Sequence, residues 1–184
     1  MNLELLASLI GIVYIILEYR ASWWLWIVGI IMSLFYIYIF ANVNCYAWSL
    51  TYLYYLGANI YGIIVWKKNN TKDSYLGITH LPRKYYSKLL GIIVLLSLFL
   101  FFIIHRFTDS VIPVSESFST ALSIVGMWLM AKKYVQHWYV WLVVNTIYVM
   151  GNLYQELYFS AILFMVYFLV SILGLLHWRK LAGK

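Results

Sequence analysis

QHWYVWLVVNTIYVMGN, residues 136–152, is the stretch that decides the fold class. It is a hydrophobic run that carries two Asn side chains among Trp and Tyr rings. An Asn side chain in hydrocarbon costs free energy unless it finds a hydrogen-bonding partner. The polar and aromatic residues step by three and four, so they share one face of a predicted membrane-spanning helix: Trp138, Trp141, Asn145, Tyr148 and Asn152.

The composition of the whole chain agrees with a membrane protein. The 184 residues are 65% hydrophobic and 10% charged, with a mean hydropathy of +0.84. Soluble domains carry about 25% charged residues, and a soluble core of this size could not bury so much apolar surface. The single cysteine, Cys45, excludes a disulfide framework. The first apolar run lacks a basic start, so we expect no cleavable signal sequence. The fold class is therefore predicted to be an all-α integral membrane protein.

Seven apolar runs are long enough to span a bilayer as helices. They cover residues 3–17, 23–40, 45–66, 89–104, 113–131, 138–153 and 157–178.

Basic residues set the predicted orientation. With seven alternating spans, twelve of the thirteen Lys and Arg residues fall on one side of the membrane, and Arg106 is the exception. Basic loops stay in the cytoplasm, so the N-terminus is predicted outside and the C-terminus inside. The net charge of +7 is then explained by helix flanks, and nucleic acid is not an expected partner. The twelve are Arg20, Lys67, Lys68, Lys72, Arg83, Lys84, Lys88, Lys132, Lys133, Arg179, Lys180 and Lys184.

Two blocks of the chain resemble each other. Trp23 and Trp26 recur as Trp138 and Trp141 at an offset of 115, whereas residues 61–68 resemble residues 173–180 at an offset of 112. The difference predicts a loss of three residues between the blocks. It also places Ile30 opposite Asn145, so the two halves would differ in chemistry.

The blocks predict a seven-helix arrangement of three, one and three. Spans one to three and five to seven would form parallel triple-helix repeats, because an odd connecting span gives both the same orientation. The predicted parts are a first repeat (1–66), a basic cytoplasmic loop with a connector helix (67–110) and a second repeat (111–184).

Two further spans carry a polar and aromatic stripe at helical spacing. A cavity near the midplane, lined by amides and rings, would suit a flat aromatic cation. The alternative readings are that Trp and Tyr anchor helix ends at the interface and that Asn joins helices. Glu116, after Pro113, either complements a helix start or attracts a cation to the outer mouth. The stripes are Tyr52, Tyr55, Asn59, Gly62 and Trp66, and Phe164, Tyr167, Ser171, Gly174 and Trp178.

Enzymatic chemistry is not predicted. His80, His105, His137 and His177 lack metal-ligand spacing, and no Gly-rich phosphate loop or nucleophile set is found in the sequence. We therefore expect neither an enzyme nor a metal or other cofactor. A seven-helix receptor is a distant alternative, but residues 157–178 lack the Lys that retinal would need.

The stretch MWLMAKKYVQHWYVWLVVN, residues 127–145, resembles the PnuC family of vitamin transporters. The family signature Trp-x-x-Trp-x-x-x-Asn is met by Trp138, Trp141 and Asn145. Three flanking segments also fit the family pattern: LSIVGM (122–127), KKYV (132–135) and ANIYG (58–62).

The resemblance implies a fold similar to the SWEET sugar transporters, a homotrimer and a multi-pass location in the bacterial cytoplasmic membrane. It implies uptake of nicotinamide riboside by facilitated diffusion, with trapping by a cytosolic kinase. Relatives take thiamine, riboflavin or deoxynucleosides, and thiamine stays the main alternative here, since it is also an aromatic cation. Tyr52 stands where many nicotinamide riboside carriers have Gln.

The resemblance assigns Trp138, Trp141 and Asn145 to substrate binding, with Asn59 as a further candidate. The full predicted substrate site adds the stripe residues and the acid: Tyr148, Tyr55, Tyr52, Glu116 and Tyr167.

Overall fold

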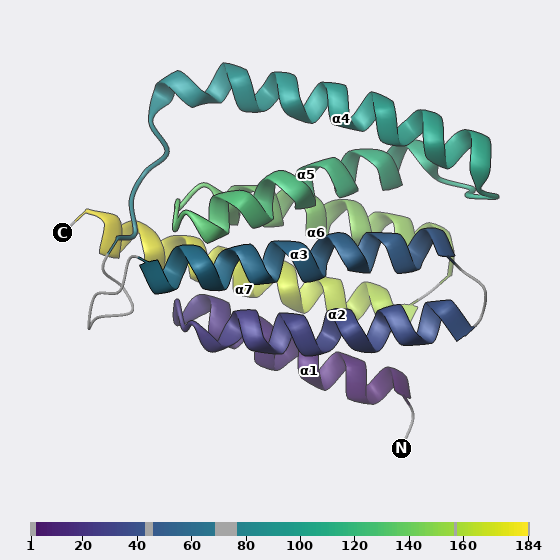
Figure 1. Cartoon of the computed structure of the whole chain (residues 1–184), viewed down its shortest axis with the longest axis horizontal. Coiled ribbons are helices and arrows are strands. Elements are labelled where there is room, and N and C mark those ends of the chain that lie inside the picture. Colours follow the sequence, from purple (N-terminus) through teal and green to yellow (C-terminus); the bar gives the residue numbers. More distant parts are fainter. Residues whose placement is uncertain (1–2, 43–45, 69–76, 157, 184) are drawn as a thin grey trace. The chain divides into compact units, whose positions relative to one another are not determined.

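The chain folds into helices joined by short turns (Figure 1). The computed structural model describes residues 3–42, 46–68, 77–156 and 158–183. Each of the seven apolar runs coincides with one α-helix of these residues, so the all-helical fold is confirmed. The helices are α1 (Leu3–Tyr19), α2 (Trp24–Asn42), α3 (Tyr46–Lys68), the 3-10 helix η1 (Arg83–Tyr85), α4 (Tyr86–Phe107), α5 (Pro113–Ala131), α6 (His137–Tyr154) and α7 (Tyr158–Ala182).

Contacts between backbones divide the chain into two units. Unit 1, Met1–Gly77, holds α1 to α3, and unit 2, Ile78–Lys184, holds η1 and α4 to α7. The predicted connector helix α4 packs along α5 and is part of unit 2.

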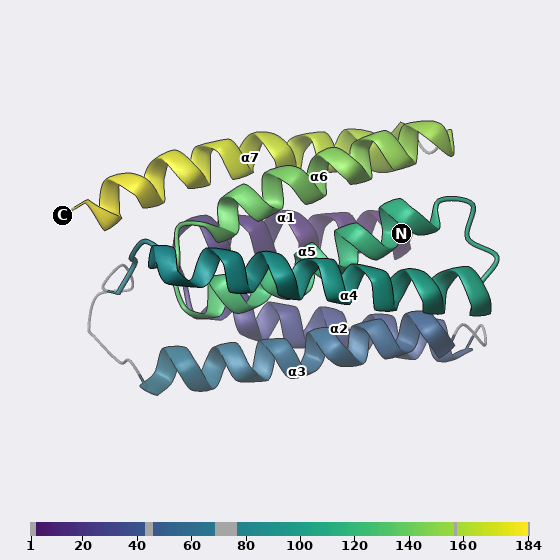
Figure 2. The same ribbon diagram turned by 90° about the horizontal axis from the view of Figure 1, so that it is seen from above.

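In unit 1, α1 packs against α2, and α2 runs antiparallel along most of α3 (Figures 1 and 2). The alternation of direction brings the basic residues of this unit to one end, where Arg20 follows α1 and Lys67 and Lys68 close α3. Lys72 and Lys184, which the topology prediction also used, lie outside the described residues.

In unit 2, α4 packs on α5, α5 on α6, and α6 runs along α7 (Figure 2). Pro113 is the first residue of α5, as the sequence predicted, because a first-turn proline loses no helical hydrogen bond. Lys132 follows α5, and Arg179 and Lys180 lie in the last turn of α7, so these basic residues share one end of the unit.

The turn between the first two helices and the turn between α5 and α6 have the same backbone structure. Ala21 has φ 48° and donates its N–H to the Glu18 carbonyl at 2.9 Å; Lys133 has φ 54° and donates to the Met130 carbonyl at 2.9 Å. The corresponding residues are 112 apart. The next backbone hydrogen bonds obey the same offset, from Ser22 to Leu17 and from Tyr134 to Leu129.

An indole ring lies directly over a glycine in each unit. A Cβ on Gly62 of α3 would overlap the Trp26 ring of α2, and a Cβ on Gly174 of α7 would overlap the Trp138 ring of α6. Each ring also meets a second indole edge-on. The second indoles are Trp66, at 5.4 Å and 88° from Trp26, and Trp178, at 5.9 Å and 81° from Trp138.

These contacts correct the predicted register of the first half. Trp26, and not Trp23, holds the position of Trp138, and the offset is 112 from the turn through the helix pair. The predicted offset of 115, and with it the loss of three residues, is wrong. Trp23 is 48% exposed, whereas Trp26 and Trp138 are both fully buried.

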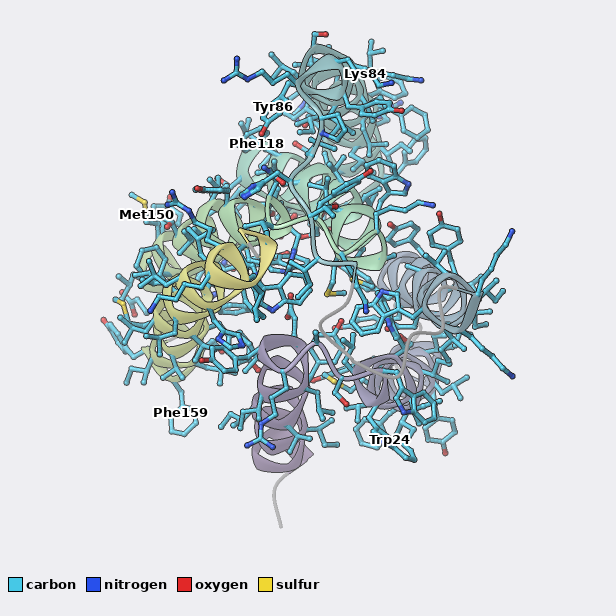
Figure 3. All side chains as sticks on the ribbon, turned by 90° about the vertical axis from the view of Figure 1, so that its left-hand side faces the viewer. Trp24, Lys84, Tyr86, Phe118, Met150 and Phe159 are labelled. Atoms are coloured by element: carbon cyan, nitrogen blue, oxygen red, sulfur yellow. The ribbon has the colours of Figure 1, made fainter. Side chains whose placement is uncertain are left out.

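Apolar side chains cover much of the exterior of the units. No described residue of α4 is buried, although α4 is among the helices long and apolar enough to cross a membrane. Figure 3, which looks along the helices, shows Met150 of α6 and Phe159 of α7 pointing away from the ribbons. A surface of this kind suits hydrocarbon rather than water. Among the described residues, the long apolar helices are Arg83–Phe107, Pro113–Ala131 and Tyr158–Ala182.

The segment that leads into α4 is attached to the α5–α6 turn. Thr79 forms a parallel bridge with Tyr134, donating to the Lys133 carbonyl at 3.1 Å and accepting from the Val135 N–H at 3.0 Å. The Leu81 N–H donates to Oε1 of Gln136 at 2.8 Å. The Gln136 amide nitrogen lies 3.2 Å from the Tyr86 hydroxyl and 3.3 Å from His80 Nδ1. We call residues 79–81 with Gln136 the linker clasp.

Candidate functional site

Asn145 lies between α6 and α7 and is 7% exposed. Its Nδ2 donates to the hydroxyl of Ser171, on α7, at 3.2 Å. The Ser171 hydroxyl in turn donates to the backbone carbonyl of Tyr167 at 2.7 Å. A chain of hydrogen bonds therefore runs from the Asn145 side chain through the Ser171 hydroxyl to the Tyr167 carbonyl, and it joins α6 to α7.

Tyr148 is one turn further along α6 and faces α5. The side chains of Ser119 and Ser123 lie near its hydroxyl, and the Glu116 carboxyl is close enough to interact with it electrostatically. Both serines are buried, and each also donates to a carbonyl of its own helix. Glu116 lies in the first turn of α5, where a negative side chain is favoured by the helix dipole.

Aromatic rings extend this polar group toward the end of unit 2 that lies opposite the basic last turn of α7. The Tyr148 ring lies 4.7 Å from the ring of Phe164, which meets the Tyr167 ring edge-on at 5.8 Å. Asn152 follows Tyr148 by one turn of α6, and its Nδ2 donates to the Tyr148 carbonyl at 2.7 Å.

The two tryptophans of the signature have different surroundings. Trp141 approaches Gly126 of α5, where an added Cβ would lie 3.4 Å from the edge of the ring. Trp138 is fully buried over Gly174 and beside Trp178, so in this structure it packs α6 against α7.

Asn59 is the polar centre of unit 1. Its Nδ2 donates to the Tyr55 carbonyl at 2.7 Å, and its side chain occupies the space that a Cβ on Gly29 of α2 would need. The side chain is 3% exposed, and its Oδ1 is buried without a hydrogen-bonding partner. Asn59 therefore lies at the α2–α3 contact.

Tyrosine rings lie between Asn59 and the end of unit 1 that is opposite its basic residues. The Tyr52 ring stacks on Tyr36 of α2 at 4.6 Å and 19°, and meets Tyr55 at 5.8 Å. At an offset of 112, Tyr36, Tyr52 and Tyr55 correspond to Tyr148, Phe164 and Tyr167 of unit 2.

The polar pair of each unit obeys the same offset, but the two residue types are exchanged. Asn145 on α6 corresponds to Ser33 on α2, and Ser171 on α7 corresponds to Asn59 on α3. Ser33 is buried and donates to the Gly29 carbonyl at 2.8 Å. The prediction that Ile30 stands opposite Asn145 is therefore wrong. At these two positions, each unit has one amide and one hydroxyl side chain.

Comparison with known proteins shows which family the chain belongs to. The sequence model of the family described as nicotinamide mononucleotide transporter matches residues 1–180. The chain belongs to this family. The predicted resemblance to PnuC is confirmed, because curated relatives of that name also match.

Two such relatives are the nicotinamide riboside transporters PnuC of Escherichia coli strain K12 and of Shigella flexneri. Each is 27% identical over an alignment of 171 residues, covering 79% of this chain and 72% of the relative. A crystal structure of the vitamin B3 transporter PnuC matches with a TM-score of 0.75 and 19% identity. That match covers 96% of this chain and 80% of the solved one, and it shows that the fold is shared.

This member of the nicotinamide mononucleotide transporter family is a multi-pass membrane protein with an all-helical fold. Its relatives are transporters and not enzymes. Among the described residues, no group of three His, Cys, Asp or Glu side chains could hold a metal ion.

In this family member, the structure brings most of the predicted site residues into two polar groups. Trp141, Asn145, Tyr148, Tyr167 and Glu116 are on facing helices of unit 2, and Tyr52, Tyr55 and Asn59 are together in unit 1. Trp138 is the residue whose observed contacts are those of helix packing.

Sequence reasoning missed the serines of α5. Ser119 and Ser123 lie near the Tyr148 hydroxyl, yet neither was a predicted site residue. With Glu116 and Gly126 they step by three, four and three, which is the same stripe that marked α6. Reading α5 for that stripe would have found them.

Proposed function

We propose that this protein carries nicotinamide riboside across the bacterial cytoplasmic membrane by facilitated diffusion, and that a cytosolic kinase traps it by phosphorylation. The supporting observation is the match to nicotinamide riboside transporters over 79% of the chain, combined with a hydrogen-bonded amide, Asn145, inside a spanning helix pair. The three long apolar helices and the family match agree with a transporter rather than with a receptor or a membrane enzyme.

We propose amide and aromatic side chains as the substrate-binding residues. Asn145 and Asn59 would supply amide groups, and tyrosine rings would stack on the nicotinamide. A pyridinium is positively charged, so ring faces attract it, and Glu116 would raise its concentration at the outer mouth. The residues proposed to bind substrate are Trp141, Asn145, Tyr148, Tyr167, Glu116, Asn59, Tyr55 and Tyr52, with Trp138 holding α6 in place.

The proposed architecture is two parallel triple-helix repeats joined by α4, similar to the SWEET transporters. The recurrence of turns, indole–glycine contacts and tyrosine groups at one offset supports it. We propose transport by alternating access, in which the substrate site opens to each side of the membrane in turn. We also propose a homotrimer, with the N-terminus outside and the C-terminus in the cytoplasm.

Ligand binding by purified protein tests this function. Calorimetric titration with nicotinamide riboside should give saturable binding, and Asn145→Ala should weaken it by about 1–2 kcal/mol, because a polar ligand group loses its partner. Thr146→Ala is the matched control, because the Thr146 hydroxyl is exposed and donates to the Leu142 carbonyl of its own helix.

Thiamine is the comparison ligand in the same titration. Tyr52 replaces the family Gln and stacks on Tyr36, which provides ring surface that thiamine could also use. Tighter binding of thiamine would reassign the cargo within the family. Binding of neither vitamin, or unchanged affinity in Asn145→Ala, would refute the proposed site.

A further inference from the structure

The hydroxyl of Ser171 has one hydrogen, and the structure shows where it goes. The hydroxyl donates to the Tyr167 carbonyl at 2.7 Å, so toward Asn145 the oxygen can only accept. The Asn145 carboxamide must therefore present its NH₂ group to Ser171, as its Nδ2 does at 3.2 Å. Amide oxygen and nitrogen are hard to tell apart by shape alone, and this hydrogen-bond chain removes the ambiguity.

The rest of the Asn145 amide has hydrogen-bonding capacity that Ser171 does not use. No hydrogen bond to its Oδ1 occurs among the described residues, and one N–H of Nδ2 is not engaged by Ser171. The group therefore offers an acceptor and a donor side by side. A carboxamide, or an aminopyrimidine with its ring nitrogen, carries the complementary donor and acceptor.

We propose that Ser171 is a positioning residue that fixes the orientation of the Asn145 amide, and so selects ligands with an N–H donor beside an acceptor. This inference rests on the proposed function. With Ser171 in place, a carboxylate in the position of the carboxamide would face Oδ1 with two acceptors and no donor. Without Ser171, the Asn145 amide could turn over and offer its NH₂ to that carboxylate.

Selectivity between two ligands measures this orientation. The probes are nicotinamide riboside and nicotinic acid riboside, which differ in having a carboxamide or a carboxylate. We expect the native protein to bind the carboxamide more tightly than the carboxylate. In Ser171→Ala, the dissociation constant for nicotinic acid riboside divided by that for nicotinamide riboside should fall by about tenfold, the equivalent of one neutral hydrogen bond. Thr146→Ala should leave the ratio unchanged.

A second variant, in which the two residues are exchanged, keeps the inference testable if Ser171→Ala does not fold. Asn145→Ser combined with Ser171→Asn gives α6 and α7 the residue arrangement that α2 and α3 have in Ser33 and Asn59. We expect this variant to keep the native melting temperature and to lose at least about tenfold in affinity for nicotinamide riboside, because the amide has moved to the other helix.

The outcomes are separable. If Ser171→Ala weakens both ligands by the same factor, or if the double exchange keeps the native affinity for nicotinamide riboside, Ser171 has a purely structural role and the inference is wrong. If the native protein binds neither riboside, the proposed function fails and this inference fails with it. A thiamine titration distinguishes an aminopyrimidine from a carboxamide as the group that Asn145 meets.

Discussion

Gly174 permits the closest approach of α6 to α7, because the ring of Trp138 occupies the space above it. The same relation holds between Gly62 and Trp26, so both helix pairs depend on an indole seated on a glycine. Small residues allow close helix packing in membranes, where the hydrophobic effect adds little between helices.

Gly174→Ala should destabilise the protein by about 1–3 kcal/mol, because the methyl group overlaps the fully buried Trp138 ring. Thermal unfolding in detergent measures the change. Gly91→Ala on α4 is the control: nothing lies within 4 Å of the added Cβ, so its melting temperature should be unchanged or slightly higher. Equal melting temperatures for the two variants would contradict the packing role of Gly174.

Helical spacing within one span predicts part of the site, whereas contacts between spans were not predictable. The face formed by Asn145 and Tyr148 followed from helical spacing, and the structure places Asn145 in a hydrogen bond with Ser171 and Tyr148 beside the serines of α5. The register of the first half did not follow, because Trp23 and Trp26 have the same spacing as Trp138 and Trp141 and so match by identity at the wrong offset. Which indole sits over a glycine is decided by packing between helices, and no single helix carries that information.

The exchange of Asn and Ser between the two units was not predictable from the sequence for a different reason. Ser33 aligned with Asn145, and Asn59 with Ser171, each count as a mismatch when positions are compared one at a time. They match only when the two positions of a unit are taken together, and that requires knowing which residues of neighbouring helices face each other.

At the scale of elements, the linker clasp joins the start of the α4 segment to the α5–α6 turn. The sequence predicted only a polar and basic loop here. Buried Ile78 and Leu81 and the Gln136 side chain give part of that loop a fixed structure.

Gln136→Ala should loosen the linker clasp, because the Leu81 N–H loses its acceptor. The expected result is roughly fivefold faster hydrogen exchange at the Leu81 amide, for a loss of about 1 kcal/mol. Gln155→Ala is the control, since the Gln155 side chain is exposed and bonds to the Gly151 carbonyl of its own helix. Unchanged exchange at Leu81 in Gln136→Ala would show that the Thr79 bridge alone holds the segment.

At the scale of the molecule, the seven helices and their bounds were largely predictable, because apolar length fixes a spanning helix. The proposed orientation across the membrane depends on the basic residues and can be tested directly. Asp109 and Lys132 are exposed beyond opposite ends of α5.

Single cysteines at these two positions, in a protein carrying Cys45→Ala, should differ in reaction with a maleimide that cannot cross membranes. We expect Asp109→Cys to react in intact cells and Lys132→Cys only after permeabilisation, because basic loops are retained in the cytoplasm. The reverse pattern would invert the proposed orientation, and labelling of both from outside would contradict the number of spans.

The unbroken offset of 112 bears on the history of the gene. If the two proposed repeats arose by tandem duplication, any later insertion or deletion in one copy would have changed the offset beyond that point, yet the value is the same from the Ala21 and Lys133 turns to Trp66 and Trp178. Point substitutions alone would then separate the copies. The exchange of Asn and Ser would have passed through an intermediate in which one copy held two amides or two hydroxyls, and the second substitution returned that copy to one of each.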